Sequence, residues 1–441
     1  MVKGGCPNEG CPYTDAKGDQ CDGCGKLVNA VELIDPKCTT CGSTPIIKSS
    51  EHIFINLTKI QPALEKWVAE ASVKGNWSSN SISFTKTMLE KGLLGRCITR
   101  DLKWGTQVPI EKFAEKVFYV WFDAPIGYIS ITANYTDEWK QWWQNEENVQ
   151  LYQFMGKDNI TFHTVIFPST LIGSGQPWTK LHHISTTEFL NYEKDENGVP
   201  LKFSKTRNTG VFGDDAMETG IPSEVWRYFL LSNRPENQDT VFLWNDFVAK
   251  NNNELLANLG NFSNRALKFT ASAFASKVPA YSGDINEADQ AFLDGLNAKI
   301  RTYMEQMEAV KLKDGLKTAM EYSSDCNGYF QMFKPWDLNK QEATKERCQQ
   351  VVNTALNALF ALCVILEPFM PSFSAKVYEQ LAIQRELRHE TMLEQLSRDS
   401  GLIRSLVPGG HTIGTPEPIF REIKPEEAEA WKVRFSGKNK K

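Results

Sequence analysis

The chain has no long apolar run and no excess of positive charge. Its 441 residues include 49 Lys and Arg against 54 Asp and Glu, a formal net charge of -5. The longest apolar stretch, residues 358–366, is far shorter than the ~20 residues that a membrane span needs. The start, MVKGGCPNEGC, has no charged segment followed by an apolar one. We therefore expect a soluble, intracellular protein with no membrane partner, in which any basic site is local.

Disulfides are also not expected, because an intracellular compartment keeps thiols reduced. Six of the ten cysteines lie within residues 6–41, in the segments CPNEGC, CDGC and CTTC. Two cysteine pairs can present four thiolates to one tetrahedral Zn²⁺. We favour this interpretation over the alternative, in which the cysteines are free thiols on a loop. The predicted zinc ligands are Cys6, Cys11, Cys21 and Cys24. Cys38 and Cys41 form half a site, which is either idle or completed by a pair upstream of the chain. The scattered cysteines, expected to be buried, are Cys97, Cys326, Cys348 and Cys363.

The central part of the chain has an α/β pattern. The runs KVFYVWFDA (116–124) and LYQFMGKD (151–158) predict buried parallel strands, and residues 159–173 predict a helix directly after the second. Ligands of open parallel sheets lie beyond the carboxyl ends of the strands. Residues expected to line one such crevice are Trp121, Asp123, Gly156, Lys157, Asp158 and His163. Taken singly, a strand aromatic or a histidine is more often a core residue.

From about residue 245 to about 385 the apolar period becomes helical. The core face predicted for the first helix consists of Phe247, Leu255, Leu259, Phe262, Ala266 and Phe269. A separate polar stripe holds Asn258, Asn261 and Arg265. Such a stripe is usually solvated surface, but it can also contact bases. Trp336 follows Pro335, where a helix should end, and is expected to offer an exposed ring on which an unpaired base could stack.

The segment LKFSKTRNTGVFG (201–213) places Lys202, Lys205 and Arg207 among small polar residues before Gly210. Its plain interpretation is a solvated hairpin tip. Its functional interpretation is an anion site.

Together these motifs resemble the methionyl-tRNA synthetases of the eukaryotic cytosolic type, a class I family. The likeness runs almost end to end, through GDQCDGCGK, CITRDLKWG, YVWFDAPIGYISIT, GKDNITFH, KFSKT, NLGNFSNRA, KPW and GHTIGT. LKFSKT corresponds to the KMSKS signature loop, with Phe203 and Thr206 as departures. The resemblance therefore implies that the anion is the triphosphate of ATP, which Lys202 and Lys205 neutralise as pyrophosphate leaves.

The resemblance also assigns the other site residues. The methionine pocket would comprise Trp121, Ala124, Pro125, Tyr128 and His163. The ATP site would comprise Gly156, Asp158, Lys202, Ser204 and Lys205, with Arg100 pairing to Asp158. The anticodon residues would be Asn261, Arg265 and Trp336. The implied cofactors are ATP, Mg²⁺ and Zn²⁺, and the implied partners are tRNA(Met), methionine and other proteins of synthetase complexes in the cytoplasm.

The implied architecture is a class I Rossmann-like catalytic domain with a zinc-knuckle insertion, followed by an all-α anticodon-binding bundle. The expected boundaries are 1–95 for the knuckle region, 96–190 for the second half of the catalytic domain, 191–245 for the signature loop and stem-contact region, 246–420 for the bundle and 421–441 for a tail.

None of the six histidines lies in the HIGH-type sequence that class I enzymes carry at the first strand-to-helix turn. We therefore expect a partial chain without the N-terminal half. Two alternatives stay open: a tRNA-binding fragment or scaffold without catalysis, and a class I synthetase for another apolar amino acid.

Overall fold

A computed structural model describes residues 2–21, 24, 27–195, 197–205, 208–281, 285–383 and 390–437. Contacts divide the chain into two compact units. The first comprises residues 1–59 and 93–135, and the second comprises residues 60–92 and 136–441. Each unit has its own elements and its own buried side chains.

The first unit begins with a small cysteine-rich sheet. Strand β1 (Val2–Gly5) lies between β2 (Ala16–Lys17) and β5 (Ile34–Cys38), and both pairings are antiparallel. A second ladder joins β3 (Asp19–Gln20) to β4 (Leu27–Val28), followed by the 3₁₀ turn η1 (Ala30–Glu32). The buried side chains here are Cys6, Ala16, Cys21, Val28 and Leu33. So small a cluster cannot hold a fold alone, as expected for a segment cross-linked by metal.

The remainder of the first unit contains short antiparallel ladders and one helix. The ladders join β6 (Phe54–Ile55) to β7 (Arg96–Cys97) and β8 (Thr99–Arg100) to β9 (Val117–Phe118), with η2 (Glu111–Phe113) between. Helix α3 (Val120–Tyr135) follows β9 directly.

The predicted strand over residues 116–124 is therefore wrong beyond Phe118. Only Val117 and Phe118 pair as a strand, antiparallel rather than parallel, and Val120 already begins α3. An apolar run does not by itself distinguish a strand from a buried helix. Here the run continues to Tyr135, a length that suits a helix.

The α/β part of the second unit is built on two parallel strands, β10 (Leu151–Gly156) and β11 (Leu181–Thr187). Helix α1 (Leu57–Lys74), whose first residues belong to the first unit, packs Trp67 and Val68 beside Leu181 and Ile184. The other helices are α2 (Ser79–Glu90), α4 (Trp139–Trp143), η3 (Lys157–Asn159), η4 (Phe162–Ile166) and α5 (Phe167–Gly173). The strand predicted over 151–158 is confirmed for residues 151–156, while Lys157 and Asp158 lie in η3, and the helix predicted after it is confirmed.

One face of β10 is less covered than the sequence suggested. Tyr152 is 41% exposed and Phe154 is 54% exposed, while Gln153 between them is buried. Parallel strands normally carry helices on both faces of the sheet. Strand β10 therefore presents two aromatic side chains that the described residues leave partly uncovered.

A second small sheet connects this part to the helices. Its central strand β12 (Leu190–Lys194) pairs antiparallel with β13 (Pro200–Leu201) and parallel with β14 (Thr240–Phe242). Helices α6 (Gly213–Glu218) and α7 (Ser223–Ser232) lie between β13 and β14 in the sequence. The loop of interest, residues 202–210, follows β13.

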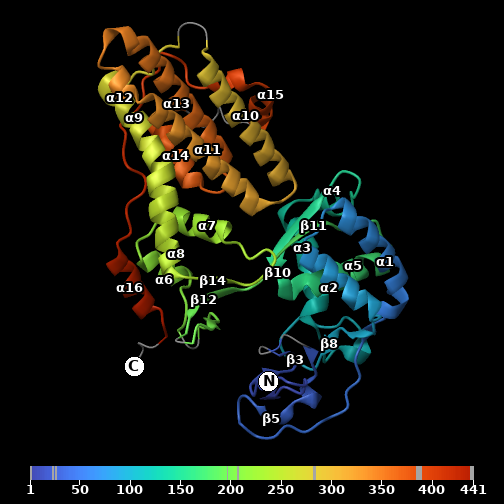
Figure 1. Ribbon diagram of the computed structural model, residues 1–441. Helices are drawn as coiled ribbons and strands as arrows, with labels where there is room; N and C mark the ends of the chain where they lie inside the picture. The colour runs from blue at the N-terminus through green and yellow to red at the C-terminus, as the bar shows by residue number, and fades with distance from the viewer. Residues whose placement is uncertain are drawn as a thin grey trace. The chain divides into compact units, whose positions relative to one another are not determined.

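The helical bundle begins with an almost continuous helical segment of three elements. These are α8 (Trp244–Ala249), the π-helical segment η5 (Lys250–Gly260) and α9 (Asn261–Ala273). The others are α10 (Glu287–Glu308), α11 (Leu312–Phe333), α12 (Pro335–Leu338), η6 (Glu342–Thr344), α13 (Lys345–Leu366), α14 (Pro371–Gln380), α15 (Glu390–Arg398), η8 (Ser400–Ser405) and α16 (Pro425–Arg434). Helical structure thus continues past residue 385. Figure 1 shows α11 beside α10 and α13.

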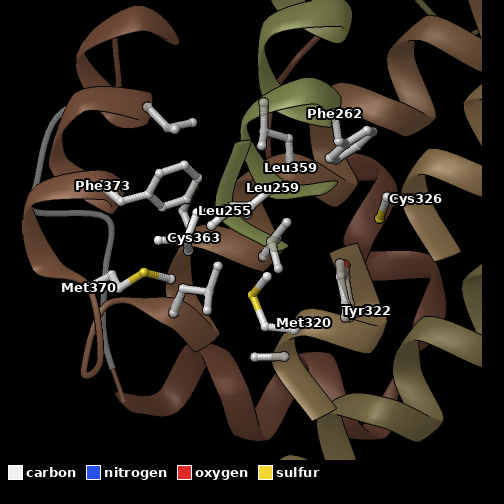
Figure 2. Close-up of a cluster of buried hydrophobic side chains, with 14 of the residues drawn as sticks. Leu255, Leu259, Phe262, Met320, Tyr322, Cys326, Leu359, Cys363, Met370 and Phe373 are labelled. Atoms are coloured by element: carbon white, nitrogen blue, oxygen red, sulfur yellow. The ribbon is translucent and has the colours of Figure 1, made fainter. Parts of the chain in front are cut away.

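The bundle core confirms the predicted helical face. Phe247, Leu255, Leu259 and Ala266 are fully buried and Phe262 is 1% exposed, whereas Phe269 is only partly buried. Figure 2 shows Leu255, Leu259 and Phe262 facing the side chains of α11 and α13. Cys326, Cys348 and Cys363 are buried as expected, but Cys97 is half-buried.

One segment, Glu342–Leu366, is long and apolar enough to cross a membrane by composition. In the structure 83% of its apolar window is buried. Packing against the other bundle helices accounts for its apolar character.

Candidate functional site

Cys6, Cys11, Cys21 and Cys24 come together as predicted. Their four Sγ atoms all lie within 4.8 Å of one another. The Cys6–Cys24 and Cys11–Cys21 sulfur distances are 3.8 and 3.9 Å. Four thiolates at ~2.3 Å from one tetrahedral Zn²⁺ would be about 3.8 Å apart. The amide of Asn8 donates to the sulfur atoms of Cys6 (3.3 Å) and Cys24 (3.8 Å), which would support thiolate charge. The donor set and its spacing fit a closed structural zinc site.

Cys38 and Cys41 form a separate turn. The N–H of Cys38 donates to the carbonyl of Ser43, and the N–H of Gly42 donates to the carbonyl of Cys38. The Cys41 thiol lies 2.8 Å from the Ser43 hydroxyl. Among the described residues this pair joins no metal-binding cluster, so it remains half a site.

The loop at residues 202–210 is a hairpin. Ser204 and Thr209 exchange backbone hydrogen bonds of 2.9 and 3.0 Å, and Lys202 and Lys205 are exposed. Gly210 adopts φ +111°, and a Cβ there would lie 2.3 Å from the Phe203 ring, so only glycine fits. Thr206 and Arg207 lie outside the described residues. The hairpin thus presents both lysines on a turn with fixed ends.

Lys157, predicted to line the crevice, is ion-paired in the structure. Its ammonium group bonds the carboxylates of Glu188 at 2.5 Å and Asp239 at 2.9 Å. Asp239 also accepts a hydrogen bond from the N–H of Phe189. Burial acts to raise the pKa of Asp239, but the pKa is lowered, because the hydrogen bonds from Lys157 and Phe189 and the charges of Lys157 and Lys202 outweigh burial. Lys157 therefore ties the end of β10 to the start of β14. Nothing in the sequence spacing signalled this connection.

Gly156 and Asp158, which flank Lys157, are exposed at the carboxyl end of β10. A Cβ at Gly156 would meet no atom within 4 Å, so the space beside it is open. This is the position where parallel sheets bind ligands.

His163 lies in η4 immediately after this turn. Only 4% of it is exposed, and its Nδ1 lies 2.9 Å from the carbonyl oxygen of Asn159, the geometry of an Nδ1–H donor. The Phe162 ring packs edge-on at 4.7 Å. Burial lowers the pKa of His163 below its usual value, although the Asn159 bond opposes this. The imidazole is therefore neutral at pH 7.

Three histidines with lowered pKa values lead to a pH prediction. Burial is also the largest cause that lowers the pKa values of His182 and His183. Unfolded histidine titrates near pH ~6.5, so below that pH the unfolded chain binds protons that the folded chain resists. We expect the full free energy of unfolding above pH ~6.5. Below that pH, until the lower pKa values of the folded chain are reached, each histidine should reduce it by at most about 1.4 kcal/mol per pH unit.

The measurement is urea unfolding between pH 7.5 and 5, above the range in which carboxylates titrate. His163→Gln is the matched variant and should flatten the pH dependence. A midpoint that does not change over this range would contradict the prediction.

The other predicted pocket residues lie in the first unit, on α3. Pro125 is buried, Trp121 is half-buried, Ala124 is exposed and Tyr128 is 40% exposed. The guanidinium of Arg96 lies 4.7 Å from the Trp121 ring centroid. The apolar character of α3 extends around the helix, since Val120, Ile126, Ile131 and Tyr135 are also exposed.

Arg100 also belongs to the first unit. Its guanidinium lies 3.7 Å from the Tyr119 ring centroid and donates to the carbonyl oxygen of Thr99. Asp158 lies in the second unit. The Arg100–Asp158 pair, like the union of α3 with Gly156 and His163 in one crevice, stays a prediction.

The predicted anticodon residues are partly together. The Arg265 guanidinium lies 4.8 Å from the Trp336 ring centroid and donates to Gln331. The Asn261 amide donates to Asn327 at 3.3 Å, and the Asn258 amide donates to the carbonyl oxygen of Met320. The polar stripe is therefore bonded to α11 and is not simply solvated surface. Trp336 is half-buried, because Phe330 packs against its edge, so the expectation of a freely exposed ring is wrong.

Comparison with known proteins gives two adjoining family matches. Residues 1–267 match the class I tRNA synthetases (M), and residues 278–440 match the anticodon binding domain of methionyl tRNA ligase.

Individual relatives agree with this result. The chain is 48% identical over 447 residues to the cytoplasmic methionine--tRNA ligase of Arabidopsis thaliana, covering 99% of this chain and 54% of that protein. It is 44% identical over 440 residues to the cytoplasmic enzyme of Saccharomyces cerevisiae, covering 99% and 55%. The chain thus spans about half the length of the curated relatives it matches.

A solved structure supports the fold. The Mycobacterium tuberculosis methionyl-tRNA synthetase, solved with methionyl-adenylate, has a TM-score of 0.71 at 22% identity, over 88% of this chain and 72% of that one. The class I catalytic fold followed by a helical anticodon-binding domain is confirmed. The chain belongs to the methionyl family of class I tRNA synthetases.

Proposed function

We propose that this protein contributes to the ATP-dependent ligation of methionine to tRNA(Met) through methionyl-adenylate. The observation that carries the proposal is the hairpin at residues 202–210. It presents Lys202 and Lys205 to solvent on a turn. The ends of this turn are fixed by Ser204, Thr209 and Gly210. Two ammonium groups on such a turn can neutralise charge that grows as pyrophosphate leaves the α-phosphorus.

The remaining roles follow from positions at the ends of secondary-structure elements. Gly156 and Asp158 would contact adenosine, where the backbone is open to solvent. His163, which is buried, and Trp121, Ala124, Pro125 and Tyr128 of α3 would each contact the methionine side chain. A neutral, aromatic-lined pocket suits an uncharged thioether side chain.

The reaction requires no covalent intermediate with the protein. The methionine carboxylate attacks the α-phosphorus of Mg²⁺-bound ATP and pyrophosphate leaves; the terminal ribose hydroxyl of the tRNA then attacks the anhydride and AMP leaves. Positioning and charge neutralisation carry both steps. Zn²⁺ held by Cys6, Cys11, Cys21 and Cys24 would be structural, because four thiolates complete its coordination.

The test is charging of purified tRNAs with each apolar amino acid, using this chain together with the part of a relative that it does not match. We expect methionine and tRNA(Met) alone to be used. Charging with another apolar amino acid would support the rival class I specificity instead.

A second candidate is a tRNA-binding fragment without catalysis. The exposed apolar surfaces of α3 and β10 favour it, because within the described residues nothing covers the predicted pocket walls Trp121 and Tyr128 completely. In this reading the bundle binds tRNA while methionine is not activated. The cytoplasm and the proteins of synthetase complexes remain the proposed setting and partners.

The anticodon assignment predicts a specific binding defect. Trp336→Ala should weaken binding of a CAU anticodon stem-loop by about tenfold, because stacking of a base is worth roughly 1–3 kcal/mol. Trp336→Phe is the matched control, since it retains a ring against Phe330 and Arg265. Binding is measured by fluorescence anisotropy, alongside the melting temperature of each variant.

Arg265→Gln should reduce the preference for CAU over other anticodons. Equal affinity of Trp336→Ala and the parent chain for the stem-loop would contradict the assignment. A large fall in the melting temperature of Trp336→Ala would also contradict it, because the loss of affinity would then reflect unfolding.

A further inference from the structure

The far arm of the hairpin at residues 202–210 consists of Thr209 and Gly210, and it is hydrogen-bonded on both of its sides. Thr209 pairs with Ser204 on one side and forms an antiparallel bridge to Ser436 on the other. The N–H of Gly210 donates to the carbonyl oxygen of Phe435 at 3.1 Å. Residues 435–436, more than 200 positions later, thus lie beside the loop, joined to it by one hydrogen bond and one isolated bridge.

Aromatic packing holds residues 435–436 in place. The Phe435 ring stacks on Trp244 with centroids 6.1 Å apart, and Trp431 of α16 packs on the same indole at 5.2 Å. Trp244 is fully buried, its indole N–H donates to the Tyr192 hydroxyl at 2.9 Å, and its backbone N–H donates to Glu193. Tyr192 in turn packs against Phe203 of the loop.

Charge adds less than this packing. Lys432 lies 3.5 Å from Glu193, and Arg434 pairs with Glu218, but one or both partners of each pair are well exposed. Exposed ion pairs contribute little to stability. The anchor is therefore the aromatic cluster of Trp244, Trp431 and Phe435.

The two ends of the loop have little freedom to adjust. Phe203 fills the space where a Cβ at Gly210 would lie, and Gly210 has a backbone conformation that other residues rarely adopt. If the pairing to residues 435–436 were absent, this arm would lose the hydrogen bond at Gly210 and the bridge at Thr209. The position of Lys202 and Lys205 would then be less well defined.

We propose that residues 431–436 are a positioning element for the signature loop: the C-terminal segment holds the Thr209–Gly210 arm, so that the two lysines are oriented before ATP binds. This rests on the proposed function only for the role of the lysines. The contact itself is independent of that role.

The test compares chains that end at Arg434 and at Gly437. Both lack residues 438–441, but only the first loses the pairing partner of Gly210. Hydrogen exchange at Gly210 and trypsin cleavage after Lys205 should be about tenfold faster in the shorter chain and unchanged in the longer one. Equal rates in the two chains would overturn the proposal.

Point variants cover the case in which the shorter chain fails to fold. Phe435→Ala should reproduce the faster exchange and cleavage, and Phe435→Tyr should restore the parent rates. Identical behaviour of Phe435→Ala and the parent chain would again overturn the proposal.

A kinetic arm separates this inference from the proposed function. In an enzyme completed as described above, Phe435→Ala should lower kcat for pyrophosphate exchange and leave the KM for methionine unchanged. Faster hydrogen exchange at Gly210 with an unchanged kcat would show that the segment holds the loop without orienting the lysines. This result would overturn the orienting role. If the completed enzyme shows no pyrophosphate exchange at all, the proposed function fails. The hydrogen-exchange and proteolysis results would still show whether residues 435–436 hold the loop.

Discussion

The 441-residue chain alone is expected to catalyse methionine-dependent ATP–pyrophosphate exchange at least ~10²-fold more slowly than the same chain supplied with a HIGH-bearing segment. In the proposed function, Lys202 and Lys205 would stabilise departing pyrophosphate only when ATP is already bound. No histidine of the printed sequence lies in a HIGH-type context. Loss of a single charge-stabilising donor commonly costs 10²–10³ in rate, and here a whole set must come from other residues.

The fold gives an independent reason for this expectation. Within the described residues β10 pairs only with β11, and Tyr152 and Phe154 on β10 are exposed. Helix α3 exposes apolar residues on several sides, as expected for a helix that another element covers. Methionine and ATP would therefore meet only part of their pocket.

The experiment adds, covalently or in trans, the part of a relative such as the Arabidopsis thaliana enzyme that this chain does not match. Exchange should then appear, and Lys205→Ala should lower it by roughly 10²–10³. Glu429→Ala, on the exposed face of α16, is a surface control that should leave the rate unchanged. Robust exchange by the 441-residue chain alone, lost in Lys205→Ala, would show that the incomplete-pocket interpretation is wrong.

Removal of zinc is expected to unfold residues 2–38 while leaving the helical bundle intact. The buried cluster of this segment is too small to stabilise it, and structural zinc contributes about 10–16 kcal/mol in small metal-bound domains. Metal analysis should give one zinc per chain after purification without chelator. Hydrogen exchange should show protection of β1, β2 and β5 lost on chelation, with α11 and α13 unchanged.

Single substitutions identify the ligands. Cys21→Ser should abolish zinc binding, because it removes a fully buried ligand from the four-sulfur cluster. Cys38→Ser is the matched control and should retain one zinc, since Cys38 and Cys41 are only half a site. A zinc content of zero in the parent chain, or equal losses in both variants, would refute the assignment.

The sequence was most informative where a local pattern specifies a local structure. Paired cysteines at short spacing predicted the four-sulfur cluster because turn geometry alone brings each pair together. The helical period of Phe247, Leu255 and Leu259 predicted a buried face for the same reason. The hairpin around Ser204 and Thr209 and the parallel strand ending at Gly156 were likewise accessible from residues close in sequence.

Errors occurred where the environment of a segment decides its structure. The run at 116–124 was assigned to a strand because apolar content does not distinguish strand from helix without a longer view. Trp336 was expected to be exposed because Pro335 ends a helix, but Phe330 and Arg265 cover part of its ring. In both cases residues outside the motif determined the result.

The sequence by itself determined the family, the α/β-then-helical order, the candidate zinc ligands and the two lysines of the signature loop. Only the tertiary structure decided that Lys157 is an ion-paired connector and that Phe435 bonds the loop at Gly210. The physical reason is sequence separation. A spacing pattern records contacts between residues a few positions apart, whereas Lys157 meets Asp239, and Gly210 meets Phe435, only after the intervening chain has packed.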